Sequence, residues 1–465
     1  MKLKVYVYRL SQPSRAILIF CKVNGIDFEE IKIELMKRQQ FSPEFKEVNA
    51  MGQVPAIVDG KFKLFESHAI LIYLACAFPG VADHWYPNDL FKRAKIHSVL
   101  DWHHSNLRFG ATKFVQNTIL GTALGIPMNP QAAAEAEKLL SASLQKIESF
   151  WLKGNGRFLL GSNQPSIADL SLVCEIMQLE VLDEKDRIRI LGPHKKVQQW
   201  IEDTKLITRP HFDEVHKFLF KIKEHLHKQQ SAGASSDTKP TVNGIDFEEI
   251  KIELLKRQQF SPEFKEVNAM GKVPAIVDGK FKLFESHAIL IYLACAFPGV
   301  ADHWYPNDLF KRAKIHSVLD WHHSNLRFGA AKFVLNTKLG TALGIPLNPQ
   351  AAAEAEKLLS ASLQKIESFW LKGNGRFLLG SNQPSIADLS LVCEIMQLEV
   401  LDEKDRIRIL GPHKKVQQWI EDTKLATRPH FDEVHKILFK IKEHLHKQQS
   451  AGASSDTKPT LQSKM

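Results

Sequence analysis

Ser11 is the residue of this chain whose type and position best suit chemistry. An alternating apolar segment precedes it and a helical pattern with Pro13 in its first turn follows, so Ser11 is expected where a strand meets a helix. A hydroxyl at that point can donate a hydrogen bond to an anion, and the helix dipole favours negative charge there. Arg15, four residues on, could add positive potential. The position also suits an ordinary helix N-cap, and both interpretations stay open at this point.

Two further polar motifs precede apolar runs. Glu66-Ser67 stands before the run Ala69 to Phe78, where the free N–H groups of a helix start would suit a carboxylate or would simply be capped. Ser166-Ile-Ala-Asp169 has a hydroxyl and an acid three residues apart, which predicts a capping box at the start of another helix.

The pattern around these residues predicts a small α/β domain followed by an all-α domain. Strands are expected at residues 2–8 and 28–35, and a hairpin at 54–58 and 62–65. Helices are expected at 14–23 and 69–78, and every segment from Asp89 onward has helical spacing. The last of these places Phe212, Val215, Leu219 and Ile222 on one face.

The chain also contains a near-duplicate of itself. Residues 23–241 reappear as residues 242–460, and only the first occurrence has residues 1–22 in front of it, so we call residues 1–241 copy 1 and residues 242–460 copy 2. Such long and similar copies are unlike the short repeats of a solenoid. The copies differ at eight pairs of positions: Met36/Leu255, Gln53/Lys272, Thr112/Ala331, Gln116/Leu335, Ile119/Lys338, Met128/Leu347, Ile207/Ala426 and Phe218/Ile437.

Composition shifts divide the chain into six predicted parts. Residues 231–239 are rich in Gly, Ser and Pro, which is typical of a flexible linker. The predicted parts are an α/β domain at 1–80, a helical domain at 89–228, a linker at 229–241, a truncated α/β domain at 242–299, a second helical domain at 308–449 and a flexible tail at 450–465.

Composition favours a globular protein and argues against several other classes. The 44% of hydrophobic residues suffice for a core, whereas the longest apolar run of copy 1 is about half of a membrane span. No signal peptide is expected, because polar residues interrupt the N-terminus. The net charge of +10 is scattered, which argues against nucleic-acid binding. Five cysteines in apolar surroundings predict buried free thiols and a reducing compartment.

Taken together, these motifs resemble a theta-class glutathione transferase, and the plant peroxisomal branch is the most similar. The resemblance rests on Ser11-Gln-Pro-Ser-Arg15, Gly52-Gln-Val54-Pro55, Leu64-Phe-Glu66-Ser67 and Ser166-Ile-Ala-Asp169, in that order. It covers residues 1 to about 230 and nearly all of copy 2. It implies a thioredoxin-like domain that binds glutathione, a helical domain that shapes the electrophile pocket, and a two-fold dimer.

The resemblance also implies roles for individual residues. Ser11 would hold the glutathione sulfur as a thiolate, with Arg15 nearby, and the absence of cysteine from residues 11–14 excludes dithiol exchange at this place. Val54 would pair with the cysteinyl part of glutathione beside a cis Pro55, unless Pro55 is an ordinary edge proline. Glutathione binding is assigned to Gln40, Phe41, Gln53, Val54, Pro55, Glu66, Ser67 and Arg108.

Arg108, Thr112, Gln116 and Ile119 recur at helical spacing and would wall the electrophile pocket. Three of the eight differences between the copies fall on this stripe, which indicates either a changed pocket or drift of a solvated face. The histidines, including His103-His104, have no spacing typical of a metal site, so no metal is expected.

Copy 2 has no counterpart of Ser11 or of the first strand, and we expect it to be inactive with a loosened α/β domain. The predicted function is conjugation of glutathione to small electrophiles, with reduction of organic hydroperoxides, by copy 1 alone. The alternative is a non-catalytic binder of glutathione or apolar ligands, with copy 2 as a dimerisation scaffold. Partners would be a second chain or the chain's own second copy.

Ser463-Lys464-Met465 differs by one apolar residue from a peroxisomal address, so a peroxisome is predicted, with cytosol or nucleus as the alternative.

Overall fold

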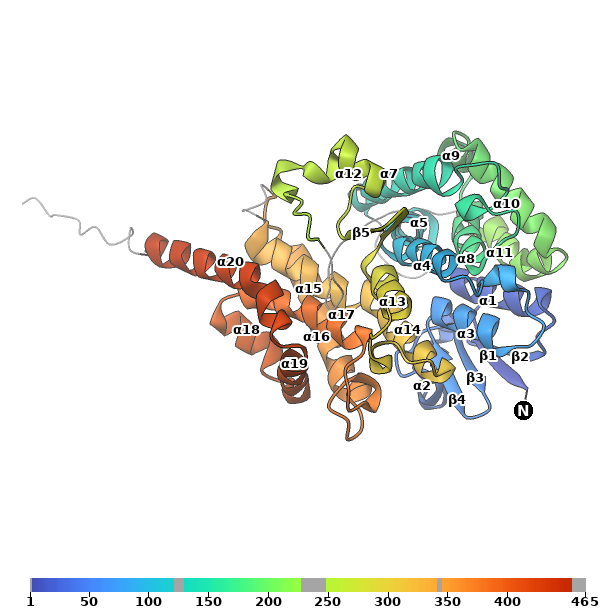
Figure 1. Ribbon diagram of the computed structural model, residues 1–465. Coiled ribbons are helices and arrows are strands. Elements are labelled where there is room, and N and C mark those ends of the chain that lie inside the picture. Colours follow the sequence, from blue (N-terminus) through green and yellow to red (C-terminus); the bar gives the residue numbers. More distant parts are fainter. Residues whose placement is uncertain (1, 121–128, 227–247, 341–344, 454–465) are drawn as a thin grey trace, which may run out of the picture. The chain divides into compact units, whose positions relative to one another are not determined.

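The computed structural model describes residues 2–120, 129–226, 248–340 and 345–453 (Figure 1). The chain divides into two compact units, one up to Ser324 and one from Asn325. The first unit therefore contains all of copy 1's described residues together with the α/β part of copy 2 and one helix beyond it. The predicted linker at 229–241 and the last three residues lie outside the described residues.

A four-stranded sheet forms the first domain of copy 1. The strand order is β2-β1-β3-β4, with β1 parallel to β2 and antiparallel to β3. β1 is therefore an interior strand with a neighbour on each side. The elements are β1 (Leu3–Val7), α1 (Gln12–Val23), β2 (Phe28–Lys32), η1 (Leu35–Lys37), η2 (Gln39–Phe41), α2 (Pro43–Val48), β3 (Ala56–Asp59), β4 (Phe62–Phe65) and α3 (Ser67–Ala77).

Helices follow in the rest of copy 1, which confirms the predicted order of an α/β domain and an all-α domain. They are η3 (Asp83–Trp85), α4 (Leu90–Ser105), α5 (Leu107–Val115), η4 (Gln116–Leu120), α7 (Pro130–Lys146), η5 (Ile147–Trp151), η6 (Leu159–Gly161), α8 (Ile167–Ile176), η7 (Met177–Val181), α9 (Glu184–Leu191), α10 (Lys195–Thr208) and α11 (His211–Leu226).

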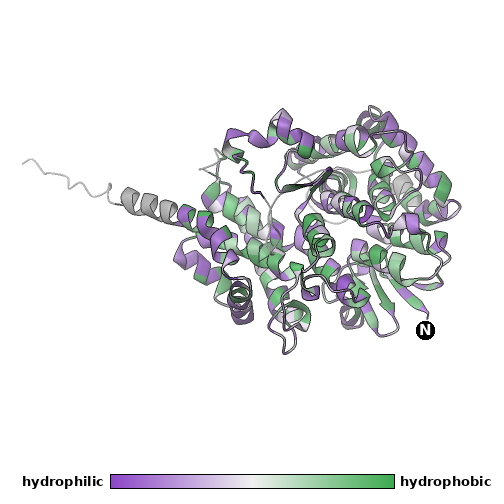
Figure 2. Cartoon of the chain, viewed as in Figure 1, coloured by the Kyte–Doolittle hydropathy of each residue, from purple (hydrophilic) through white to green (hydrophobic). Residues whose placement is uncertain are grey.

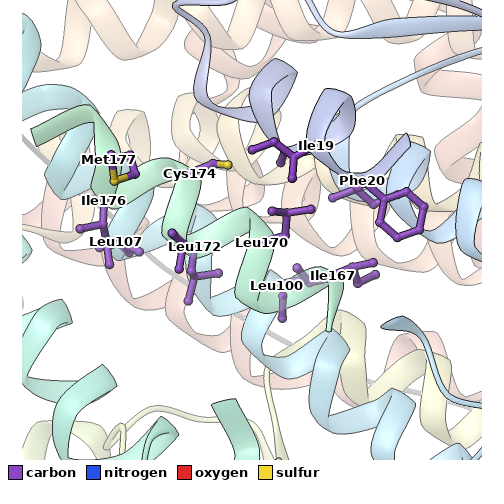
Figure 3. Close-up of a cluster of buried hydrophobic side chains, with 14 of the residues drawn as sticks. Ile19, Phe20, Leu100, Leu107, Ile167, Leu170, Leu172, Cys174, Ile176 and Met177 are labelled. Atoms are coloured by element: carbon purple, nitrogen blue, oxygen red, sulfur yellow. The ribbon is translucent and has the colours of Figure 1, made fainter. Parts of the chain in front are cut away.

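Helix α8 is the central element of the core that joins the two domains. It packs against α1 on one side and against α4 and α5 on the other, and Figure 3 shows Ile19, Leu100 and Leu107 around its buried side chains. The predicted capping box starts this helix, because Ser166 Oγ accepts a hydrogen bond from Ala168 N and Asp169 accepts one from Ser166 N. The start of α1, where Ser11 stands, is thus fixed against a buried helix.

Among its described residues, the α/β part of copy 2 forms a sheet of two strands. Residues 248–253, which match β2 and the residues after it, form no strand, because the interior strand with which they would pair is missing from copy 2. The elements of this part are η8 (Leu254–Lys256), η9 (Gln258–Phe260), α12 (Pro262–Val267), β5 (Ala275–Asp278), β6 (Phe281–Phe284), α13 (Ser286–Ala296), η10 (Asp302–Trp304) and α14 (Leu309–Ser324).

Helices α3 and α4 of copy 1 pack against α14 and α13 of copy 2. The contacts come in equivalent pairs: Ser98 Oγ donates to Phe284 O at 2.8 Å, and Ser317 Oγ donates to Phe65 O at 2.9 Å. The rings of His97 and His316 stack at a centroid distance of 5.1 Å. Most of α13 is hydrophobic, as Figure 2 shows, and the same holds for α3, whose sequence is identical. Within this unit the two copies therefore meet through equivalent surfaces.

The second unit is helical throughout its described residues. Its elements are α15 (Leu326–Val334), η11 (Leu335–Leu339), α16 (Pro349–Lys365), η13 (Ile366–Trp370), η14 (Leu378–Gly380), α17 (Ile386–Met396), η15 (Gln397–Val400), α18 (Glu403–Leu410), α19 (Lys414–Thr427) and α20 (His430–Ala453).

Helix α20 has a partly uncovered apolar face. Val434 is 48% exposed, whereas its counterpart Val215 on α11 is fully buried. In copy 1 the face of α11 packs against α1, an element that copy 2 lacks. The predicted apolar face of α11 is confirmed for Phe212, Val215 and Leu219, and the side chain of Ile222 lies outside the described part.

One expectation about the cysteines is wrong. Cys21 and Cys174 are buried free thiols, but Cys76 and Cys295, in the last turns of α3 and α13, are exposed, whereas the next residues, Ala77 and Ala296, still pack against the core. Among the described residues, no helix combines the length and the hydrophobicity that a membrane span requires.

Candidate active site

Ser11 stands at the N-cap of α1 but does not cap it. Its backbone is extended, with φ −70° and ψ 122°, and its side chain makes no hydrogen bond to the helix start. The loop is held instead by backbone bonds from Ser11 N to Tyr8 O at 2.8 Å and from Arg15 N to Ser11 O at 3.1 Å. The half-buried hydroxyl is therefore available to a ligand at the positive end of the helix dipole.

Arg15 anchors the loop that carries Ser11 to helix α8. Its guanidinium is fully buried and donates to the carbonyl oxygens of Leu10 at 2.7 Å and Cys174 at 3.0 Å. Burial lowers the pKa of Arg15 to about 10, against the opposing effect of Glu175, so the side chain stays charged at neutral pH. We therefore assign Arg15 to positioning the Ser11 loop on α8, and a direct effect on a bound sulfur stays a prediction.

Glu175 is a buried carboxylate that the sequence analysis did not single out. Its side chain is 1% exposed, and its Oε1 accepts from Thr112 Oγ1 at 2.9 Å and from Gln12 Nε2 at 3.1 Å. Its Oε2 lies 3.4 Å from Arg108 Nη1 and 3.5 Å from His103 Nε2. One carboxylate thus joins α1, α4, α5 and α8 and contacts Gln12, the residue next to Ser11. The sequence signal was a lone acid inside the apolar helix Ile167–Ile176.

The charge of Glu175 is maintained by these partners. Burial alone would raise its pKa, but the hydrogen bond to His103 and the positive charge of Arg108 outweigh burial and hold the pKa of Glu175 below its ordinary value. His103 itself has its pKa lowered to about 4, chiefly by burial, so its imidazole is neutral at pH 7. The buried negative charge is therefore paired chiefly with Arg108.

Gln40, Phe41 and Gln53 lie on two loops that touch. Gly52 has φ +65°, and a Cβ on it would lie only 3.0 Å from the Phe41 ring, so this close approach requires glycine. The Oε1 atom of Gln40 is buried without a hydrogen-bond partner among the described residues. A side-chain amide with an unused buried oxygen is a group that a bound ligand could satisfy.

The motif at Val54 and Pro55 leads into the sheet. The peptide bond between these residues is cis, as the resemblance implied. The strand ladder starts at Ala56, so the backbone groups of Val54 lie just outside it and next to the loop of Gln53. Val54 is half-buried, and its position would let its backbone groups form strand-like hydrogen bonds with an extended ligand.

Glu66 and Ser67 form the junction of β4 and α3. Glu66 has φ +70°, a conformation that a residue with a side chain rarely adopts and that is often found at functional sites. Its side chain does not cap α3, whereas Asp320 of copy 2 accepts from Ala69 N at 3.1 Å. Burial, with a further contribution from Asp320, raises the pKa of Glu66 to about 8.

The predicted stripe on α5 and η4 is only partly accessible to a ligand. Arg108 and Thr112 contact Glu175, and both they and Gln116 are half-buried, but Ile119 is fully buried in the core. At this last position copy 2 has Lys338, which forms an ion pair of 2.9 Å with Asp402. The difference between the copies at Ile119 is thus compensated within the fold of copy 2.

In copy 2, the residues around the counterpart of Glu175 differ from those in copy 1. Thr112 is replaced by Ala331, no residue corresponds to Gln12, and Glu394, the counterpart of Glu175, accepts from Gln397 Nε2 at 2.5 Å. Lys272, the counterpart of Gln53, donates to Asn106 Oδ1 at 3.0 Å.

Comparisons with known proteins identify the family. The family model "Glutathione S-transferase, N-terminal domain" matches residues 1–76 and 241–295. Glutathione S-transferase T1 of Arabidopsis thaliana is 71% identical over 236 residues, which cover 51% of this chain and 96% of that protein. The chain belongs to the glutathione S-transferase family. The human relative theta-2 is 41% identical over 180 residues, which cover 38% of this chain and 72% of that protein, and the class is theta.

Solved structures of theta-class enzymes are also similar to this chain. A human glutathione transferase theta-2 structure, described as a complex with glutathione and an unknown ligand, is 32% identical and covers 50% of this chain and 93% of that chain, with a TM-score of 0.44. Human glutathione S-transferase T1-1 in its apo form is 34% identical and covers 48% of this chain and 91% of that chain, also with a TM-score of 0.44. The family model and the theta-class relatives together assign copy 1 a thioredoxin-like domain followed by helices, and a second, two-stranded sheet lies at residues 275–284.

Proposed function

We propose that copy 1 is the only catalytic copy and that Ser11 holds the glutathione sulfur as a thiolate. The observation that carries this proposal is the Ser11 hydroxyl, which stands at the start of α1 without a capping bond, on a loop fixed by Arg15. A free thiol has a pKa of about 8.5, so a hydrogen bond to the sulfur and the helix dipole would increase the thiolate fraction at neutral pH.

The remaining site residues suit the rest of a γ-glutamyl tripeptide. The start of α3 at Ser67 suits a carboxylate, with Asp320 already accepting from Ala69 N within the first turn. Val54 lies where an extended backbone could pair, and Oε1 of Gln40 can accept a hydrogen bond from an N–H group of the ligand. Gln53 and Phe41 would border the ligand beside Gln40. Arg108 would face the sulfur from the helical domain.

The proposed conjugation balances without a metal or a redox partner. The thiol proton leaves to solvent, the thiolate forms a bond to the electrophilic carbon, and the leaving group, such as chloride, departs with its electron pair. We propose detoxification of small electrophiles of this kind as the physiological role.

The same thiolate would reduce organic hydroperoxides. It attacks the terminal peroxide oxygen, the O–O bond breaks, and the alkoxide takes a proton to become an alcohol. A second glutathione then displaces hydroxide from the resulting sulfenic acid sulfur, giving glutathione disulfide and water. Each hydroperoxide therefore consumes two glutathione molecules.

We further propose that the two copies pair within one chain in place of the usual two-chain dimer, and that the chain acts in peroxisomes. The equivalent contacts of Ser98 with Phe284 and of Ser317 with Phe65 support the pairing. The C-terminal tripeptide supports the location.

Matched substitutions in the two copies test the proposal. Ser11→Ala and Ser67→Ala are expected to reduce conjugation of a chlorinated nitroaromatic at least tenfold, whereas Ser286→Ala, the copy 2 counterpart of Ser67→Ala, should leave it unchanged. Full turnover by Ser11→Ala would contradict the role of Ser11. Glutathione binding by the parent chain without any turnover would support the alternative, namely a non-catalytic binder of glutathione or apolar ligands with copy 2 as a scaffold.

A further inference from the structure

Two histidines and one aspartate meet where α3 and α4 face α14. His68 is in the first turn of α3, His104 is in the last turn of α4, and Asp320 belongs to α14 of copy 2. His104 Nε2 lies 3.4 Å and His68 Nδ1 3.8 Å from Asp320 Oδ1. The three potential ligand atoms lie within 4.8 Å of one another. The other oxygen of Asp320 accepts from Ala69 N, so Oδ1 is the oxygen that faces the imidazoles.

The same arrangement occurs a second time with the copies exchanged. Asp101 of copy 1 lies 4.0 Å from His287 Nδ1 and 3.6 Å from His323 Nε2, and its other oxygen accepts from Ala288 N at 2.8 Å. The rings of His104 and His323 stack at a centroid distance of 5.2 Å, so the two trios are neighbours. Each trio takes both histidines from one copy and its aspartate from the other.

The first trio has unused nitrogen atoms in a buried place. His68 Nδ1 and both ring nitrogens of His104 have no hydrogen-bond partner among the described residues, and both side chains are at least nine-tenths buried. A buried polar atom without a partner costs about 1–3 kcal/mol of desolvation, and such atoms are rare in native proteins. Ring stacking alone does not account for three of them at one carboxylate.

The second nitrogen of His68 is already engaged. His68 Nε2 lies 3.3 Å from His103 Nδ1, and His103 Nε2 in turn lies 3.5 Å from Glu175 Oε2. In metal sites, the ring nitrogen that does not bind the metal usually bonds to a further polar group, which fixes the orientation of the imidazole. The chain from Glu175 through His103 leaves His68 Nδ1 as the free nitrogen, directed at Asp320.

We propose that His68, His104 and Asp320 bind a divalent transition metal such as Zn²⁺, and that Asp101, His287 and His323 form a second, equivalent site. Two imidazoles and one carboxylate form a ligand set that zinc accepts, whereas Ca²⁺ and Mg²⁺ prefer oxygen ligands throughout. Three protein ligands leave one position of a tetrahedral ion for water. Because each site joins both copies, the metal clamps α3 and α4 of copy 1 to the helices of copy 2.

The proposal is tested on the full-length chain after removal of metals with a chelator. Titration with Co²⁺, a spectroscopic substitute for Zn²⁺, should give visible d–d bands typical of tetrahedral coordination and saturate at two ions per chain. Zn²⁺ should displace the Co²⁺ and raise the midpoint of thermal unfolding. His104→Gln should lose one of the two equivalents, His323→Gln should lose the other, and the double variant should lose both.

His316→Gln is the matched control, because His316 is a buried, stacked histidine of the same interface that belongs to neither trio. It should keep both equivalents. Circular dichroism checks the fold of each variant, and Asp320→Asn, which keeps an acceptor for Ala69 N, replaces His104→Gln if that variant does not fold. Failure of the chelated parent chain to bind Co²⁺, or binding that survives both His104→Gln and Asp320→Asn, would overturn the proposal.

Discussion

Gln12, the residue directly after Ser11, donates a hydrogen bond from Nε2 to Oε1 of the buried Glu175 at 3.1 Å. The bond joins the first residue of α1 to the helix at the centre of the core, across the boundary between the α/β domain and the helical domain. Thr112 and Arg108 contact the same carboxylate. We infer that the buried charge of Glu175 helps to position the Ser11 hydroxyl, through its hydrogen bond with Gln12.

Glu175→Gln is the substitution that tests this dependence. An amide cannot accept from Gln12, Thr112 and Arg108 at once, so we expect a loss of about 1–3 kcal/mol in the free energy of unfolding of copy 1 and a lower rate of conjugation. The matched control is Glu394→Gln in copy 2, where Ala331 replaces Thr112 and Gln12 has no counterpart. Urea unfolding and conjugation kinetics measure both effects, and equal losses for the two variants would contradict the role of Glu175.

The stability of the chain should also depend on pH through Glu175. The folded-state pKa of Glu175 lies below its ordinary value, so its contribution to stability is present above the unfolded pKa of about 4.3 and is lost as the pH falls through the folded pKa. The stability difference between the parent chain and Glu175→Gln should be constant above about pH 5 and shrink below pH 4. The midpoints of urea unfolding between about pH 3 and pH 7, a range that brackets the pKa of about 4.3 of an unfolded Glu, measure this stability difference. A difference that grew on acidification would contradict this account.

Gln53→Lys should tighten the binding of glutathione by copy 1. Gln53 is exposed beside Gln40, and a lysine there could form a charge-assisted bond to the glycine carboxylate of glutathione. Such a bond contributes about 1–2 kcal/mol, so the affinity should rise about tenfold. Calorimetric titration with glutathione checks it, with Lys61→Gln as a control for a change of surface charge. Unchanged or weaker binding would remove Gln53 from the site.

Val215 on α11 and its counterpart Val434 on α20 test what the missing first helix of copy 2 does to stability. Val215→Asp places a carboxylate in the fully buried face of α11 and should destabilise copy 1 by about 3 kcal/mol or more. Val434→Asp changes a side chain that is 48% exposed and should alter stability by less than about 0.5 kcal/mol. Thermal unfolding of both variants measures the two changes in stability. A large loss of stability in Val434→Asp would show that this face of α20 is covered.

The local pattern predicted the elements that position the site. The first strand, the turn at Ser11 and the capping box at Ser166 follow from spacing and residue type, and the structure has all three. Element ends were less predictable: the second strand stops at Lys32, because the chain turns into 3-10 helices after it.

Long-range groupings could not be predicted from spacing. Glu175 gathers partners from residues 12, 103, 108 and 112, and only the packing of four helices shows that they meet. The trio of His68, His104 and Asp320 draws on two copies of the repeat, so no sequence spacing could show it. The sequence predicts Arg15 only as a charge near the sulfur, because spacing cannot show its hydrogen bonds to the carbonyl oxygens of Leu10 and Cys174.

The central claim is tested most directly by the ionisation of bound glutathione. The ultraviolet absorbance of the thiolate, followed against pH for the saturated parent chain, gives the pKa of the bound thiol. It should lie well below the value of about 8.5 of a free thiol, and Ser11→Ala should return it to within about one unit of that value. An equally low pKa in Ser11→Ala would contradict the claim that the Ser11 hydroxyl holds the sulfur as an anion.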